Sequence, residues 1–357
     1  MACPRLYYWT YEKGWRPGKT RKPLRFGSVG HAGIDTLAHH KNAPIEAAIN
    51  VATVAIQSIY DEHIATAADW PDAQQAQHDL ALECVTVQCL VHGYAYAWSS
   101  ASLEIIESEK TFSLPIINPE TGSASRTFTQ AGKRDRIAKL DDGRLALMET
   151  KFVSDDLADD SDYWRMLSIN QQLSKYILAA RADGIDVQTT IQDVIRKPTI
   201  KPCDQPELDE HGLVVVRDAT GQRVKKKDGH WRLTADEDKG FTIRKYPMTA
   251  DQWRAKLSAD ISADPAKYFA RREIPRLDSD LDEYRHELWY IADAIRLCRN
   301  SGRWFRNSGS CKRFNSLCPY YPLCAGIIST TNGIPDGFRL AESCHEELSS
   351  IGEGAAL

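Results

Sequence analysis

The sequence contains no long apolar run. No stretch of its 357 residues approaches the roughly 18 consecutive apolar residues of a membrane-spanning helix. Its first residues, MACPRLYYWTYEKGW, lack the apolar core of a secretory signal peptide. We therefore expect a cytoplasmic protein without membrane association. Its 42% hydrophobic and 26% charged residues are typical of a globular chain, and its length allows one large domain with insertions or two smaller ones.

An excess of positive charge is also missing. The formal net charge is -4, which argues against a protein that simply coats nucleic acid, because such proteins usually carry overall positive charge. Two local clusters contrast with this average, since basic residues gather between Lys13 and Arg25 and again between Arg296 and Arg313. Each cluster is either a solvated face or a contact surface for nucleic acid, and the charge pattern leaves both readings open.

The nine cysteines do not fit a disulfide framework, because their number is odd and no secretory signal precedes them. Four of them fall between residues 298 and 324, in a polar segment, which favours a metal site. Cys311, Cys318 and Cys324 supply three thiolates, and such a site needs a fourth ligand. That ligand is either Cys298, in the same segment, or Cys3, which would tie the N-terminus to the C-terminal region.

The spacing of these cysteines bears on the metal. Zinc ligands usually come in two close pairs, and the sequence has no C-x2-C pair. The pattern therefore favours an iron–sulfur cluster over zinc, with structural zinc as the alternative.

Hydrophobic periodicity predicts an α/β protein. Helices are expected at residues 28–40, 45–64 and 73–99. Short β-type runs between residues 103 and 152, separated by the turn signals NPETGS and DDG, predict consecutive antiparallel strands of one sheet. A helix at 162–182 and a strand at 186–197 then complete a layered arrangement.

Five regions follow from this pattern. They are a helical region with Cys3 and His31 (1–100), a core (101–200), a charged insertion (201–248), a helical region with the clustered cysteines (249–328) and a fraying tail (329–357). The insertion contains a predicted hairpin in LVVVRDATGQRVKKK, and the segment YFARREIPRL interrupts the later helices as a short strand.

The central chemical signal is Asp135 followed by Glu149-Thr150-Lys151. On a strand, Glu149 and Lys151 project from the same face. If Asp141-Asp142-Gly143 is a three-residue loop with a left-handed glycine, Asp135 falls directly opposite Glu149. A two-residue turn would instead move Asp135 opposite Thr150, on the wrong face.

Two adjacent carboxylates repel each other and are tolerated mainly when a hard divalent cation lies between them, and magnesium or manganese suits such oxygen ligands. Lys151 would then orient or help activate a water and stabilise charge that develops on phosphate. The alternative is a hairpin that carries a surface ion pair.

Three further polar residues accompany this signal. Gln172 and Tyr176 lie four apart on the predicted helix and therefore share a face near the site. Their alternative role is that of helix residues with Tyr176 half in the core. His31, in RFGSVGHAGID, could serve as a neutral metal ligand near a helix start, although a single histidine is more often structural.

Taken in order, five segments resemble a known family. They are CPRLYYWTYEKGW, LRFGSVGHAGID, GKRDRIAKLDDGRLALMETKF, QQLSKY and CKRFNSLCPYYPLC. Together they span nearly the whole chain and resemble the RecB-type PD-(D/E)XK nucleases, in particular the iron–sulfur branch that includes AddB, CRISPR-associated RecB-like exonucleases and many phage proteins.

The resemblance implies a restriction-endonuclease-like core, in which a mixed central sheet is flanked by helices, with helical additions at both ends and a cysteine-bound cluster. It implies residue roles as well. The metal ligands are His31, Asp135 and Glu149, the catalytic residues are Asp135, Glu149 and Lys151, the DNA-binding pair is Gln172 with Tyr176, and the 4Fe-4S ligands are Cys3, Cys311, Cys318 and Cys324. Glu109 matches an acidic position without an assigned role. The C-terminal cysteines are spaced more widely than in the family, which leaves zinc open.

From the resemblance we expect a Mg2+- or Mn2+-dependent deoxyribonuclease that acts as an exonuclease on single-stranded DNA or free DNA ends. A place in DNA repair or recombination, in a cell or a phage acting in its host cytoplasm, would fit this activity. Because no helicase or ATP-binding segment is present, the protein would act alone or with a recombination or helicase partner. The competing hypotheses are a non-catalytic DNA-binding or assembly module of the same fold and a structural zinc protein.

Overall fold

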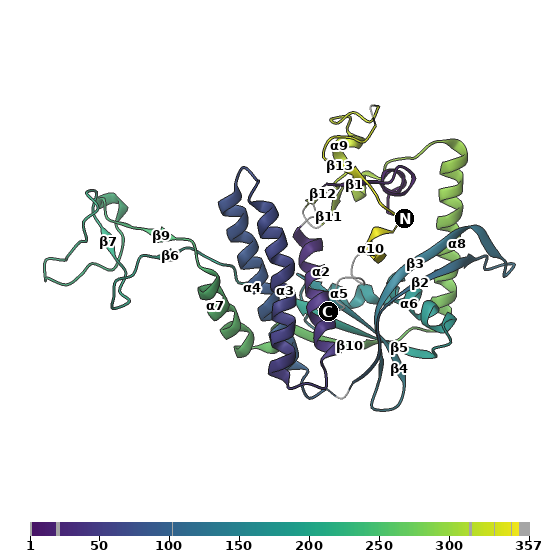
Figure 1. Cartoon of the computed structure of the whole chain (residues 1–357), viewed down its shortest axis with the longest axis horizontal. Coiled ribbons are helices and arrows are strands. Elements are labelled where there is room, and N and C mark those ends of the chain that lie inside the picture. Colours follow the sequence, from purple (N-terminus) through teal and green to yellow (C-terminus); the bar gives the residue numbers. More distant parts are fainter. Residues whose placement is uncertain are drawn as a thin grey trace.

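The computed structural model describes residues 2–18, 22–101, 103–313, 316–331, 333–343 and 345–349. Figure 1 shows a twisted sheet with helices on both sides, a long hairpin, and an arm that projects far from the body. No helix in the described ranges is long and apolar enough to cross a membrane.

A five-stranded sheet forms the centre of the molecule, in the order β10-β5-β4-β3-β2. Its strands are β2 (Glu104–Ile117), β3 (Ala124–Lys139), β4 (Leu145–Val153), β5 (Val187–Arg196) and β10 (Phe269–Ile274). β2, β3 and β4 are antiparallel neighbours, β4 and β5 run parallel, and β10 pairs antiparallel with β5. The predicted mixed α/β core and its three consecutive antiparallel strands are therefore confirmed.

The turn between β3 and β4 has the predicted form. Gly143 adopts φ 86°, and the backbone N–H of Leu140 donates to the carbonyl of Arg144 at 2.9 Å. Arg136 pairs with Met148 at the far end of the ladder. The three-residue loop is thus confirmed, and its register brings Asp135 to the position opposite Glu149.

Two helical layers cover the sheet. The first contains α2 (Lys22–His39), α3 (Ile45–Ala67), α4 (Ala73–Ala97) and α7 (Ala250–Ala263). Its core includes Ile56, Leu90 and Trp253 and reaches Ile195 and Phe269 of the sheet. The second layer contains α6 (Gln171–Ala182) and α8 (Asp278–Ser301). Burial of these apolar surfaces holds both layers on the sheet.

The helix predicted at 162–182 is interrupted. It consists of α5 (Asp162–Met166), a 3-10 turn (Leu167–Ile169) and α6. Asn170 leaves helical geometry with ψ 111° and caps α6, because its side chain accepts from the backbone N–H of Gln172 at 2.8 Å. The guanidinium of Arg276 fixes the break by donating to the carbonyl of Asn170 at 2.8 Å. As a result, the apolar residues Met166 and Ile169 are 60% and 71% exposed.

The first and last parts of the chain lie together. The N-terminal segment contains α1 (Pro4–Tyr7), a π-helix (Tyr8–Glu12) and β1 (Trp15–Pro17), and β1 pairs with β13 (Phe338–Leu340). The C-terminal segment also contains a 3-10 turn (Ser308–Ser310), β11 (Lys312–Arg313), β12 (Ser316–Leu317), α9 (Tyr321–Cys324) and α10 (Glu346–Ser349). The expectation of a fraying tail from residue 329 is therefore wrong for β13, whose strand pairing fixes it.

The charged insertion forms the projecting arm seen at the left of Figure 1. It contains only two-residue strands, β6 (Gln205–Pro206), β7 (Val216–Arg217), β8 (Thr242–Ile243) and β9 (Lys245–Tyr246), and a 3-10 turn (Glu237–Lys239). The predicted hairpin is present, because Arg217 bridges Arg223 around the turn at Asp218.

Candidate functional site

Three acidic residues lie across from one another on the neighbouring strands β2, β3 and β4. The β3–β4 register brings Glu149 beside Asp135. In the β2–β3 ladder, Ser108 pairs with Arg136 and Lys110 with Arg134, so Glu109 lies across from Asp135 on the other side. Asp135 is therefore flanked by a glutamate from each adjacent strand.

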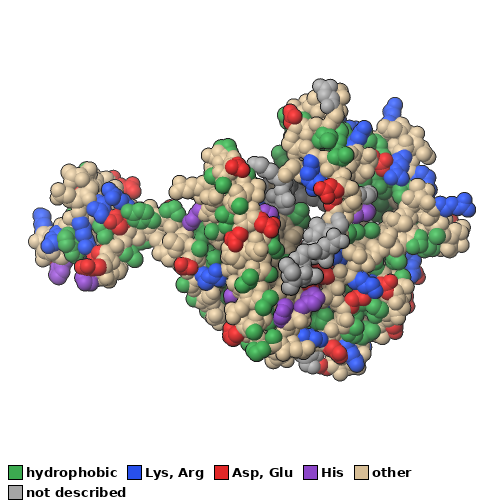
Figure 2. All heavy atoms as spheres, viewed as in Figure 1, with side chains coloured by type: hydrophobic (Ala, Val, Ile, Leu, Met, Phe, Trp, Pro, Cys, Tyr) green, Lys and Arg blue, Asp and Glu red, His purple; other side chains and the backbone are tan. Residues whose placement is uncertain are grey.

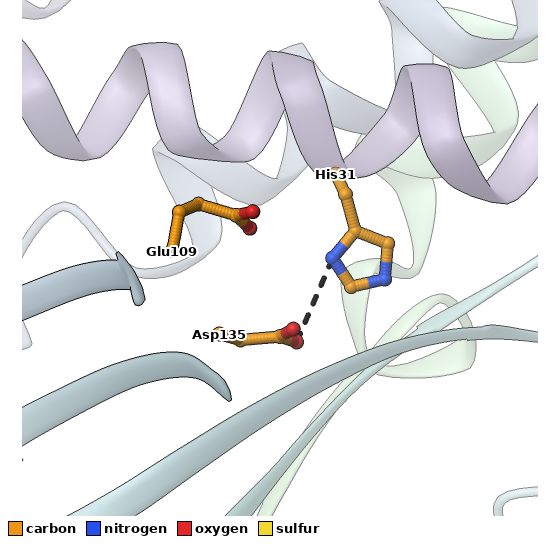
Figure 3. Close-up of side chains that lie close together, drawn as sticks. All are labelled: His31, Glu109 and Asp135. Carbon is orange, nitrogen blue, oxygen red and sulfur yellow. Dashed lines mark ion pairs between the residues drawn. The ribbon is translucent and has the colours of Figure 1, made fainter. Parts of the chain in front are cut away.

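A histidine from the helical layer joins two of these acids. One ligand atom each from His31, Glu109 and Asp135 lies within 4.8 Å of the other two. Figure 3 shows His31 reaching down from α2 toward the two acids, and its Nδ1 lies 3.6 Å from Oδ2 of Asp135. The three residues thus form a group that could hold a metal ion.

A close contact between α2 and β4 brings His31 to the sheet. A Cβ on Gly30 would lie only 2.3 Å from Cζ of Phe152, so glycine is needed for this approach. The ring of His31 packs edge-on against Phe152, with centroids 5.9 Å apart. His31 lies in the middle of α2, which begins at residue 22, and not near a helix start as the sequence suggested.

Glu149 is the most deeply buried of the acids, with 1% of its surface exposed. Its Oε1 accepts hydrogen bonds from Nζ of Lys151 and from Nε2 of Gln172, the latter at 2.8 Å. The same amide lies 2.8 Å from the hydroxyl of Tyr176. The structure therefore brings Lys151, Gln172 and Tyr176 together around Glu149.

Burial and mutual repulsion set the charges of this site. Burial, and next the charge of Asp135, raise the pKa of Glu149 to about 7 against the pull of Lys151. Burial also lowers the pKa of His31, although Asp135 opposes it, and the cations Lys151 and Arg136 lower it further. His31 therefore favours the neutral imidazole, which is the form that binds metals.

Glu109 combines ligand chemistry with an unusual backbone. Its φ is 51°, in the left-handed region that costs a residue with a side chain roughly 1–2 kcal/mol. Its carboxylate pairs with Nζ of Lys133. Burial raises its pKa, and the charges of Asp135 and Asp35 add to this while Lys133 opposes it. Such local strain is typical of residues held in place for a site.

A buried carboxylate oxygen of Glu149 indicates that a cation would fit this site. Oε2 of Glu149 is buried and has no hydrogen-bond partner among the described residues. An unpaired carboxylate oxygen in this environment is costly, and a cation is a suitable partner for it. The neutral His31 and the oxygens of Glu109 and Asp135 are a donor set that suits magnesium or manganese, and Glu149, which is not in that group of three, is the neighbouring acid on β4.

The cysteines implied as cluster ligands lie in the junction of the two chain ends. The backbone N–H of Asn307 donates to Sγ of Cys3 at 3.4 Å, and the indole of Trp9 donates to Sγ of Cys324 at 3.4 Å. The backbone N–H of Cys318 donates to the carbonyl of Cys311 at 2.7 Å. Burial raises the pKa of Cys318, and the nearby thiols of Cys324, Cys311 and Cys3 add to the effect.

These thiols do not form a compact group of ligands. No three of the cysteine sulfur atoms in the described ranges lie within 4.8 Å of one another. Four sulfurs around a single zinc would be roughly 3.8 Å apart, given a Zn–S bond of about 2.3 Å. Cys298, the alternative fourth ligand, is buried elsewhere with Ile295 and Trp304. The arrangement of these sulfur atoms thus does not match a closed zinc site.

A mixed sheet flanked by helices, with acids from neighbouring strands and a lysine gathered on it, is the arrangement of a nuclease core. A family model described as the PD-(D/E)XK nuclease superfamily matches residues 1–325, and this chain belongs to that superfamily. No curated protein matches the sequence. Membership implies phosphodiester hydrolysis with a divalent metal, while it does not distinguish the RecB-like iron–sulfur branch from others.

Glu109 is the residue that sequence reasoning did not connect to the site. Counting from the turn, Ile117 pairs with Ala124, and this register would place Ile106 opposite Asp135. An irregularity between Pro115 and Ile117 shifts the strands and brings Glu109 there. The resemblance marked its position, but no spacing rule could have given its partner.

Proposed function

We propose that this protein is a metal-dependent deoxyribonuclease that cuts single-stranded DNA or DNA ends as an exonuclease. The observation that carries the proposal is the position of Asp135 between Glu109 and Glu149, with Lys151 bonded to Glu149. Membership of the nuclease superfamily supports the hydrolytic chemistry. The DNA substrate and the exonuclease mode rest on the resemblance of the motifs.

His31, Asp135 and Glu149 would hold the metal, and Glu109 joins them because its carboxylate lies with His31 and Asp135. When bound there, Mg2+ or Mn2+ supplies positive charge that polarises the phosphodiester and makes a neighbouring water more acidic. Lys151 orients that water and stabilises negative charge that develops on the phosphate. Gln172 holds the carboxylate of Glu149 in place and is the member of the pair that would meet the DNA, while Tyr176, which is buried in the core, accepts a hydrogen bond from Gln172 and so supports its position.

The proposal extends to a 4Fe-4S cluster held by Cys3, Cys311, Cys318 and Cys324. The supporting observation is that all four lie in the junction between the N-terminal segment and the C-terminal segment. A cluster bound by these four thiolates also agrees with their mutual proximity, because burial raises the pKa of Cys318 and the nearby thiols of Cys324, Cys311 and Cys3 add to this effect. Its role is to join the two chain ends.

Cleavage of end-labelled DNA tests the function. Anaerobically purified protein is incubated with linear single-stranded, linear double-stranded and circular DNA, with Mn2+ or with chelator. We expect Mn2+-dependent release of short products from linear DNA and an intact circle. Glu149→Ala is expected to bind DNA without cutting it, while Glu273→Gln, on β10 of the same sheet, cuts normally. Equal absence of cleavage in the wild type and Glu149→Ala would contradict the proposal and favour a binding module.

A further inference from the structure

Lys175 lies on the face of α6 that covers the site. Its surroundings differ from those of Lys133 and Lys151, the two other lysines nearby. Lys175 lies one turn after Gln172, whose amide bonds to Glu149, and directly before Tyr176. Gln172 shows that this face of α6 is turned toward the acids. Lys175 is partly buried there.

Two aromatic rings and a glycine fix the position of the Lys175 ammonium. Nζ lies 4.9 Å from the ring centre of Tyr176 and 5.8 Å from that of Phe112. A Cβ on Gly132 of β3 would lie 3.1 Å from this Nζ and 2.7 Å from Cζ of Phe112. The absence of a side chain at 132 therefore leaves the space that the ammonium occupies, and the ring faces attract the cation.

The charge of Lys175 has no carboxylate partner in the described part of the chain. Lys151 pairs with Glu149 and Lys133 pairs with Glu109, whereas no carboxylate oxygen of the described residues lies within 4.0 Å of Nζ of Lys175. Burial lowers the pKa of Lys175, Glu149 opposes this, and Lys151 adds to it. A partly buried cation held beside a site without an anion is costly unless a ligand supplies the anion.

We infer that Lys175 is a substrate-binding residue whose ammonium contacts a backbone phosphate of the nucleic acid in the site. The inference rests on the proposed function and adds one phosphate contact to it. The aromatic rings orient the ammonium, and the two ion-paired lysines leave Lys175 as the cation beside the acids that is available to an anion.

A salt titration of DNA binding tests this contact. Affinity for a fluorescent single-stranded oligonucleotide is measured with Ca2+ in place of Mn2+, so that cleavage does not interfere. Lys175→Met is expected to raise Kd roughly five- to tenfold at 50 mM salt and to reduce the slope of log Kd against log salt by about 0.7, which is the loss of one phosphate contact. Lys175→Arg is expected to keep the wild-type slope.

Lys267 provides the matched control. Its Nζ also lies beside a tyrosine, 5.2 Å from the ring centre of Tyr268, but it pairs with Asp260 at 2.7 Å. Lys267→Met is therefore expected to bind DNA with wild-type affinity and slope. Lys175→Gln, which keeps a polar end, replaces the methionine variant if that variant does not fold.

The outcomes separate this inference from the proposed function. If the wild type cuts DNA and the Lys175 variants keep its affinity and salt slope, the phosphate contact is wrong while the nuclease assignment stands. Lower activity of Lys175→Met with an unchanged slope would also overturn the contact, because it would indicate a purely structural role. If the wild type neither cuts nor binds DNA, the proposed function itself fails.

Discussion

The backbone N–H of Thr150 donates a hydrogen bond of 2.9 Å to Oδ2 of Asp135. This bond connects the acid of β3 to the middle residue of Glu149-Thr150-Lys151 on β4. Because Thr150 contributes only backbone here, its side chain is free to face the other side of the sheet, where Oγ1 lies 3.4 Å from Asp193. The backbone of β4 therefore fixes Asp135 next to Glu149.

Asp135→Asn tests the charge of this acid separately from its hydrogen bond. The amide oxygen of asparagine can still accept from Thr150, so the fold is expected to remain stable. Metal affinity and cleavage are expected to fall by about 100-fold or more, since even outer partners of metal ligands contribute 10–100-fold. Calorimetric titration with Mn2+ and cleavage rates measure both effects.

Asp135→Ala is the comparison for that experiment. It leaves the N–H of Thr150 without its acceptor, which costs about 1–3 kcal/mol. Equal metal affinity in wild type and Asp135→Asn would contradict a metal role for Asp135.

Glu149→Gln tests the electrostatic cost of the buried acid. The pKa of Glu149 is raised from 4.5 to about 7, so between these values the folded protein keeps a proton that the unfolded chain has released. Rising pH therefore destabilises the metal-free fold across that window, and the loss is complete above it. In chelator at pH 8, the variant is expected to be more stable than the wild type by roughly 1–3 kcal/mol.

Thermal unfolding at pH 5 and pH 8 measures this difference. The stabilisation by the variant is expected to shrink at pH 5, and Mn2+ is expected to raise the Tm of the wild type but not of Glu149→Gln. If Glu149→Gln is less stable than the wild type at pH 8 in chelator, the buried carboxylate of Glu149 does not destabilise the metal-free fold.

Glu109→Gln tests the residue that the tertiary structure added to the site. The amide keeps the size of the side chain but binds Mn2+ less strongly, and it loses the charge paired with Lys133. Affinity for Mn2+ is expected to fall about tenfold, with a smaller loss of maximal cleavage rate at saturating metal. Wild-type affinity in this variant would restrict the metal ligands to the residues implied by the resemblance.

Cys318→Ser tests the junction of the chain ends. The variant is expected to lose visible absorbance and bound iron and to unfold at a lower temperature, because the cluster ties the two segments together. Cys298→Ser is the control, since its thiol lies apart with Ile295 and Trp304 and is expected to keep the iron. Zinc in place of iron in the anaerobic wild type would refute the cluster but keep the junction.

Several features followed from local patterns. The loop Asp141-Asp142-Gly143 determined the register that brings Asp135 to Glu149, because the glycine supplies the positive φ of that turn. Alternation along a strand put Lys151 beside Glu149. The break at Asn170 was not predicted, because the bonds from Arg276 that fix it come from a distant segment.

The sequence by itself determined which acid and lysine share a short hairpin, since turn geometry and strand alternation act over a few residues. Only the tertiary structure decided that Glu109 reaches Asp135 and that Lys175 lies against Gly132. The approach of His31 to Asp135 and of Cys3 to the C-terminal segment was implied by the resemblance and by no local pattern. These contacts depend on a shifted register, on helix packing and on the meeting of the chain ends. Such long-range placements arise from the burial of whole surfaces, and no local pattern encodes them.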